Sequence, residues 1–314
     1  MTVLEGFLNR DIRALSRIIS FVENREDGYR DLLGKLYEKV GQSTRIGITG
    51  PPGAGKSTVV NSLIHQFLSI GKTVGVIAID PSSPFTGGAL LGDRVRMNEF
   101  PTGGTVYFRS MATRGATGGL AQSTENTAVV LDAFGFDVIL IETVGVGQVE
   151  LDVIDACDTV AVVLVPESGD AVQTMKAGLM EIADIMVVNK SDRPGAERIA
   201  ADLRTMLLMR KKEEGLWKVP VISTIAVNNE NIDKLFKAIE DHVEFHKASG
   251  AFESHRREQI KKKILSILKT RFQREFVEHL AENVEFSKIV DEIFSGENNP
   301  YRVSEELYES FSDR

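Results

Sequence analysis

The sequence has a single cysteine, Cys157, so one chain can form neither an internal disulfide nor a cysteine-rich metal site. Its five histidines are scattered. Only His242 and His246 have helical spacing, and no acidic or sulfur-bearing residue completes a zinc site beside them. We expect Cys157 to be a packed structural thiol, because it directly precedes an apolar strand pattern.

Long apolar runs and an excess of basic residues are also missing. No apolar run approaches the ~18 residues that span a bilayer, and the N-terminal residues lack the features of a signal peptide. The formal net charge of −8 argues against broad binding to nucleic acid or to anionic membranes. We expect a cytoplasmic chain with neither nucleic acid nor membrane as its partner.

The apolar pattern predicts an α/β fold with a mostly parallel central sheet. Short β-rich runs alternate with helical stretches over 42–250, as in a parallel sheet covered on both faces. Helical spacing predicts an N-terminal helical hairpin over 1–41 and a C-terminal helical segment over 251–314. The predicted strands are Ile46–Thr49, Val74–Asp80, Val106–Phe108, Val138–Thr143, Val160–Val165, Ile185–Asn189 and Val219–Ser223.

A glycine-rich segment follows the first predicted strand and precedes a helix. It fits the phosphate-loop pattern G-x-x-x-x-G-K-[ST], in which backbone N–H groups surround the phosphates. Lys56 would bridge the β- and γ-phosphates, and Ser57 would ligate Mg²⁺. A glycine-rich turn without function is the alternative, but the flanking strand and helix favour a P-loop domain. The nucleotide-binding residues predicted here are Gly50, Pro51, Pro52, Gly53, Ala54, Gly55, Lys56, Ser57 and Thr58.

A second motif, Asn189-Lys190-Ser191-Asp192, follows a later predicted strand. The Asp192 carboxylate can accept hydrogen bonds from both N1–H and the N2 amine of guanine, neither of which adenine offers. Lys190 can pack along the base and Asn189 can brace the loop. An ordinary polar turn is the alternative, since the pattern is short. At the end of the next strand, Ser223, Thr224 and Ile225 are placed to give backbone contacts to the base oxygen.

A third motif places acidic residues at strand ends. Glu142 ends an apolar strand and begins an E-x-x-G pattern that closes at Gly145. An acidic residue there can hold Mg²⁺ through water, and the Gly145 N–H can bond the γ-phosphate. Asp80 ends another buried strand, and the glycine- and proline-containing stretch after it, with Asp93, is a candidate first switch. An acidic strand end and a solvated loop are the alternatives.

The sequence lacks an obvious residue to speed hydrolysis. No glutamine directly follows Gly145, and Gln148 is offset. Lys176, in the loop that begins near Asp170, is a candidate to neutralise transition-state charge. Spacing alone favours the alternative, a solvated lysine on a helix surface.

Together these segments resemble the ArgK/MeaB-type GTPases that accompany adenosylcobalamin-dependent methylmalonyl-CoA mutase. The resemblance rests on Gly50–Thr58, Asp80–Met97, Glu142–Gln148, the Asp170–Lys176 loop and Asn189–Asp192. It implies a G domain of the signal-recognition-particle type that works as a homodimer. It also implies a Mg²⁺ site at Ser57, Asp80, Asp93 and Glu142, and a catalytic set of Lys56, Glu142, Asp93 and Lys176.

The implied ligands are GTP or GDP and Mg²⁺, and the implied role is to gate adenosylcobalamin delivery into the mutase and to protect that enzyme. A cobalamin adenosyltransferase is a further implied partner. The family was once described as an arginine-transport ATPase, which fits the guanine motif poorly. Two alternatives stay open: a metal-delivery GTPase, against which the missing Cys/His motifs argue, and a nucleotide-switch interaction module with little turnover.

Overall fold

The structure is a computed structural model, and it describes residues 2–80, 104–112, 119–145, 154, 156–168, 178–209, 216–283 and 286–312. The chain divides into two compact units, Met1–Glu253 and Ser254–Arg314. No helix in the described ranges is both long and apolar enough to cross a bilayer. The candidate site lies in the first unit.

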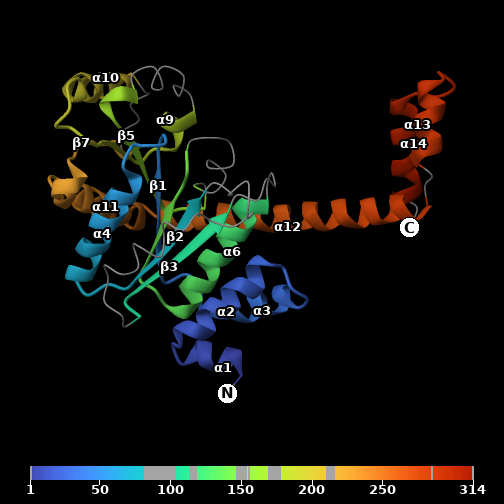
Figure 1. Ribbon diagram of the computed structural model, residues 1–314, viewed down its shortest axis with the longest axis horizontal. Helices are drawn as coiled ribbons and strands as arrows, with labels where there is room; N and C mark the ends of the chain where they lie inside the picture. The colour runs from blue at the N-terminus through green and yellow to red at the C-terminus, as the bar shows by residue number, and fades with distance from the viewer. Residues whose placement is uncertain are drawn as a thin grey trace. The chain divides into compact units, whose positions relative to one another are not determined.

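The first unit is built on a seven-stranded sheet whose paired strands all run parallel (Figure 1). Its strand order is β3-β2-β4-β1-β5-β6-β7. The predicted α/β fold with a parallel central sheet is therefore confirmed. The strands are β1 (Thr44–Thr49), β2 (Val74–Asp80), β3 (Val106–Ala112), β4 (Val138–Glu142), β5 (Thr159–Leu164), β6 (Ile185–Val188) and β7 (Val221–Ser223).

The strand register brings the motif-bearing loops to one edge of the sheet. Ile48 of β1 pairs with Glu142 of β4, and Thr49 pairs with Val162 of β5. Farther along, Leu164 pairs with Val188 of β6. Because all strands run in one direction, the loops after β1, β4 and β6 share the carboxyl edge, where α/β sheets bind ligands.

Helices cover both faces of the sheet, which is why the central strands are apolar throughout. In β4, Ile139 and Ile141 belong to one core cluster and Val138 and Leu140 to the other. The second cluster is shared with α4 (Lys56–Ser69) and α11 (Ile232–Ala248), and the first with α6 (Gly119–Phe134) and α10 (Ala196–Leu208). Figure 1 shows α4 and α6 on opposite sides of the strands.

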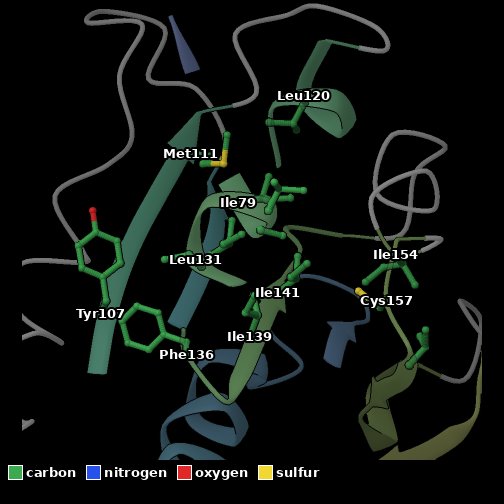
Figure 2. Close-up of a cluster of buried hydrophobic side chains, with 14 of the residues drawn as sticks. Ile79, Tyr107, Met111, Leu120, Leu131, Phe136, Ile139, Ile141, Ile154 and Cys157 are labelled. Atoms are coloured by element: carbon green, nitrogen blue, oxygen red, sulfur yellow. The ribbon is translucent and has the colours of Figure 1, made fainter. Parts of the chain in front are cut away.

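Figure 2 shows part of the first cluster, in which Ile139 and Ile141 lie among side chains from β3, α6 and the segment before β5. Cys157 lies beside Ile154 in this cluster and is buried. The prediction of a packed thiol is confirmed. Trp217 is also packed: it contacts His242 and Phe245 and donates its indole N–H to the carbonyl of Asp184 at 2.8 Å.

The N-terminal helices contribute to the same cluster. They are α1 (Val3–Leu8), α2 (Ile12–Glu23) and α3 (Tyr29–Leu36), followed by a 3₁₀ turn at Tyr37–Lys39. The sequence predicted a two-helix hairpin; the first helix is instead broken at Asp11, whose carboxylate caps α2 by accepting from the N–H of Arg13 at 2.8 Å.

The C-terminal part of the chain is helical: α12 (Ala251–Asn283), α13 (Phe286–Phe294) and α14 (Pro300–Ser312). Within the segment predicted to be helical, 251–314, the apolar spacing marks helices as far as Phe294, and the residues after it are polar, so the pattern does not locate α14. Asn299 accepts from the N–H of Arg302 at 2.9 Å, and Pro300 follows it directly. An asparagine cap before a first-turn proline is a helix-start signal that the sequence does contain.

Candidate nucleotide site

The loop after β1 takes a shape that only glycine allows at two positions. Gly50 has φ 145°, and a Cβ there would lie 2.0 Å from the carbonyl oxygen of Val163. Gly55 has φ 86°, and a Cβ there would lie 2.4 Å from the side-chain amide nitrogen of Asn189. Both conditions exclude a side chain. The glycines therefore let the loop curl against β5 and the loop after β6.

Helix α4 begins at Lys56 directly after this loop. Its N-cap, Gly55, has no side chain to accept the first N–H groups, and its first turn has no acidic residue. Backbone N–H groups at such a helix start, together with the helix dipole, favour an anion. The sequence thus leads a strand into a loop and then into a helix start suited to phosphate.

Lys56 is held between two loops. Its side chain is buried, and its Nζ donates to the carbonyl oxygens of Gly50 at 2.8 Å, Pro51 at 3.0 Å and Val144 at 3.0 Å. An ammonium group has three N–H donors. A phosphate that bonds Lys56 therefore has to replace one of these carbonyls.

Ser57 and Glu142 are in direct contact, because the Ser57 hydroxyl donates to the Glu142 carboxylate. Glu142 is buried at the end of β4. Mg²⁺ prefers oxygen ligands and is held in proteins by one or two side chains with substrate phosphates and water completing its shell. The chemistry of this pair therefore fits Mg²⁺. No group of three or more His, Cys, Asp or Glu side chains forms a metal cluster within the described ranges.

Other predicted ligands are placed only in part. Asp80 ends β2 and is aligned with Ala112 of β3. Asp93 and Lys176 lie outside the described residues, as do Gln148 and Asp170. The structure brings together Lys56, Ser57, Glu142 and Gly145, the part of the predicted set that surrounds the phosphate loop.

Gly145 is fixed by two buried hydroxyl groups. Thr49 Oγ1 donates to the Gly145 carbonyl oxygen at 3.0 Å, and Thr143 Oγ1 lies 3.0 Å from the same oxygen. The two hydroxyl oxygens are 2.8 Å apart. Sequence analysis missed both threonines, because nothing in the motif patterns marks a hydroxyl pair that only the fold assembles.

The loop after β6 is joined to the phosphate loop through Asn189. Its side-chain amide donates to the Ala54 carbonyl at 2.9 Å. Its side-chain oxygen accepts from the hydroxyl of Thr224 and from the N–H of Ala226, each at 3.1 Å. Lys190 adds a second link, since its Nζ donates to the Gly53 carbonyl at 2.8 Å. Asn189 thus holds three loops at one point.

Asp192 is exposed at the mouth of this loop. No hydrogen bond to its carboxylate is formed by the part of the chain that the structure describes, so the carboxylate is available to a ligand. Its neighbour Arg193 instead pairs with Glu167 at 2.5 Å. The hydrogen bond from Arg193 lowers the pKa of Glu167 below its usual value. Sequence analysis did not find this exposed pair.

Several of the backbone groups after β7 that were expected to contact a base are already hydrogen-bonded within the protein. The N–H of Thr224 donates to Val188 O at 2.9 Å, and the N–H of Ile225 donates to Glu230 O at 3.2 Å. The Ser223 carbonyl accepts from the side chain of Asn231 at 2.9 Å. These groups are used within the protein, so the proposed backbone contacts to a base oxygen gain no support from the geometry.

Comparison with known proteins adds a family and several relatives. Residues 15–281 match the family described as methylmalonyl-CoA mutase-associated GTPase MeaB. A Pyrococcus abyssi protein is 46% identical over 305 residues, covering 96% of this chain and 94% of that protein. The Escherichia coli GTPase ArgK is 33% identical, covering 87% of this chain and 84% of ArgK.

A mouse relative and a solved structure extend these matches. The mouse mitochondrial methylmalonic aciduria type A homolog is 31% identical, covering 98% of this chain and 79% of the mouse protein. A crystal structure of LAO/AO transport system kinase has a TM-score of 0.73 and 25% identity, covering 99% of this chain and 96% of that chain. The resemblance noted in the sequence motifs is confirmed by the family match.

Proposed function

Because the chain belongs to the family of methylmalonyl-CoA mutase-associated GTPases, we propose that it uses Mg²⁺-dependent GTP hydrolysis to serve an adenosylcobalamin-dependent methylmalonyl-CoA mutase as chaperone and gatekeeper. Hydrolysis would be coupled to cofactor delivery into the mutase and to protection of that enzyme. The observation that carries the nucleotide part is the contact between the phosphate loop and the loop after β6, made by Asn189 and Lys190.

The base is read by the loop after β6. The exposed Asp192 carboxylate accepts the two N–H groups that guanine presents, while adenine leaves it unpaired. Asn189 fixes the distance between this carboxylate and the phosphate loop, because it lies in the same loop as Asp192 and its side-chain amide donates to Ala54 O. A nucleotide with the wrong base can therefore not keep both its base and its phosphates in register.

The phosphates are held by the loop after β1. The glycine-rich backbone and the start of α4 supply N–H donors, and Lys56 places a positive charge at the transferred group. Ser57 and Glu142 would hold Mg²⁺, which neutralises charge on the β- and γ-phosphates when bound. Glu142 would act through the hydrogen bond it shares with Ser57.

The partner assignment is supported by the family description, which names methylmalonyl-CoA mutase. We propose that the mutase orders the Asp170–Lys176 loop and brings Lys176 to the β/γ-phosphates, supplying the transition-state charge that the sequence otherwise lacks. A cobalamin adenosyltransferase is the proposed source of the adenosylcobalamin.

We also propose a homodimer. The helix α12 has apolar side chains at helical spacing that are about half exposed: Ile260 49%, Ile264 53%, Leu268 56% and Phe272 50%. Such a stripe on a single helix is costly to leave in water, so a second copy is the proposed cover. The family resemblance favours the same assembly.

The test is a purified reconstitution with a B12-dependent methylmalonyl-CoA mutase. GTPase rate is measured with and without the mutase, and transfer of adenosylcobalamin to the mutase is followed by its absorbance with GTP, GDP or no nucleotide. The proposal expects faster hydrolysis with the mutase and a nucleotide-dependent transfer. A transfer that is identical under all three conditions, with no change in GTPase rate, would rule out the gatekeeper role.

A further inference from the structure

The peptide between Val144 and Gly145 faces the phosphate loop through its carbonyl group. Val144 O accepts from Lys56 Nζ at 3.0 Å. This peptide is trans, so its carbonyl and its N–H point in opposite directions. The Gly145 N–H therefore points away from Lys56. A γ-phosphate bonded by both Lys56 and the Gly145 N–H requires this peptide to turn.

The surroundings of Gly145 leave room for such a turn. Its φ is not in the left-handed region, and among the described residues the atom nearest to a Cβ built on it is Pro52 Cδ, at 4.0 Å. A phosphate can replace Val144 O as a partner of Lys56 without disturbing the phosphate loop. The other two carbonyl partners, on Gly50 and Pro51, belong to that loop and can be kept. Among these three carbonyl contacts, the contact to Val144 joins the phosphate loop to the loop after β4.

The other side of Gly145 is held in place. Its carbonyl accepts from Thr49 and lies within hydrogen-bond distance of Thr143, and both threonines are essentially unexposed. Each hydroxyl has one proton. Whether Thr143 donates to Thr49 or to Gly145, the carbonyl keeps at least one donor. Thr143 is itself fixed to β1, because its N–H donates to Ile48 O at 3.1 Å.

We propose that Thr49 and Thr143 are positioning residues for the γ-phosphate. Their hydroxyl groups hold the Gly145 carbonyl while the Val144–Gly145 peptide turns its N–H toward the phosphate, so that the movement is confined to one peptide. Without this clamp, the Thr143–Gly145 backbone has more freedom to lose when the γ-phosphate binds, which costs conformational entropy. The threonine pair thereby sets the ratio of GTP to GDP affinity. This inference rests on the proposed function as a GTPase.

The test compares GDP with the β,γ-imido analogue of GTP by calorimetry in the presence of Mg²⁺. The variants are Thr49→Val, Thr143→Val and the double variant, which keep side-chain volume and remove hydroxyl groups. The double variant should lose about tenfold in analogue affinity relative to GDP, the effect of one to two hydrogen bonds. GDP affinity should stay within about twofold, because GDP has no γ-phosphate.

Serine variants are the matched controls. Thr49→Ser and Thr143→Ser keep the hydroxyl groups, so their ratio of analogue to GDP affinity should remain that of the wild type. Thermal unfolding of every variant establishes that the chain is folded. If the double valine variant does not fold, the single variants decide: each removes one of the two hydroxyl groups at the Gly145 carbonyl and should lower the ratio of analogue to GDP affinity by about threefold.

The outcomes separate this inference from the proposed function. If the ratio of analogue to GDP affinity is unchanged in the valine variants, the threonine clamp is overturned, while the proposed GTPase function still stands. An equal loss of both ligands in a folded valine variant also overturns it, because the effect is then not specific to the γ-phosphate. A wild-type chain that binds neither guanine nucleotide overturns the proposed function itself.

Discussion

The side-chain amide of Asn189 donates to the Ala54 carbonyl at 2.9 Å and so ties the loop after β6 to the phosphate loop. The tie has a steric counterpart. A Cβ at Gly55 would lie 2.4 Å from the same amide nitrogen. The two segments, 135 positions apart in the chain, therefore constrain each other's composition.

The first prediction concerns this tie. Asn189→Ala removes three hydrogen bonds in a buried position, so it should lower stability by about 2–4 kcal/mol and weaken GDP binding. Thermal unfolding and calorimetry with GDP measure both effects. Arg193→Ala in the same loop breaks only an exposed pair with Glu167 and should change stability by less than about 1 kcal/mol. Equal effects of the two variants would show that Asn189 has no special role.

The second prediction concerns base choice. GDP should bind more tightly than ADP by several kcal/mol, because adenine leaves the Asp192 carboxylate unpaired. Asp192→Asn should weaken GDP binding and allow xanthosine diphosphate to bind, because the base of that nucleotide offers an acceptor where guanine has its N2 amine. Asp202→Asn on the exposed face of α10 is the control. If calorimetry gives equal affinities for ADP and GDP, the assignment of Asp192 as a guanine-reading residue is wrong.

The third prediction concerns hydrolysis. Lys56→Ala should reduce the GTPase rate by about 10²–10³-fold, because it removes the positive charge facing the transferred phosphoryl group. Ser57→Ala should raise the Mg²⁺ concentration needed for half-maximal rate. Lys72→Ala, which breaks only a surface pair with Asp137, is the control. Phosphate release assays give all three rates, and a wild-type rate in Lys56→Ala would contradict the phosphate-loop assignment.

The fourth prediction concerns assembly. The chain should be a dimer by light scattering at micromolar concentration, because the apolar stripe on α12 is costly to leave exposed. Leu268→Asp places a charge in that stripe and should shift the chain toward monomer. Lys269→Asp changes an adjacent exposed position outside the stripe and should leave the dimer intact. A monomeric wild type would refute the proposed homodimer.

The fifth prediction concerns the mutase. Intrinsic hydrolysis should be slow, because a transition-state charge of the kind that is missing here contributes about 10³–10⁵ in rate when a partner supplies it. Lys176→Ala should lose most of the stimulation by the mutase. Lys218→Ala, an exposed lysine elsewhere, should keep it. Full stimulation of the Lys176→Ala variant by the mutase would show that Lys176 does not supply the transition-state charge.

Much of the fold follows from local sequence, because buried parallel strands are continuous apolar runs between helices. Each of the predicted strands exists, with ends shifted by a few residues; the strand predicted over Val106–Phe108 extends to Ala112. Missed elements depend on smaller signals. The cap at Asp11 separates α1 from α2, and the Asn299–Pro300 start of α14 lies in a polar segment.

The candidate site divides in the same way. Motif spacing identifies Lys56, Ser57 and Glu142 individually, because each stands at a strand end or helix start. Spacing does not show that the Ser57 hydroxyl donates to Glu142. Nor does it reveal the Thr49–Thr143 pair, whose members are 94 positions apart and meet only through the register of β1 and β4. Contacts of this kind are properties of the fold.

The contacts of Asp132 in α6 indicate that the first unit depends on the N-terminal segment for its stability. The buried Asp132 carboxylate accepts from the backbone N–H groups of Gly41, Gln42 and Ser43 at 2.9–3.1 Å. A shortened chain that begins at β1 would lose these three donors and leave the buried carboxylate to its longer contact with Arg45, at 3.5 Å. It would also expose the apolar face that Leu15 and Ile19 now cover. An isolated G domain cut at this point should therefore be recovered mainly as aggregate, and biochemical work on the chain requires its first forty or so residues.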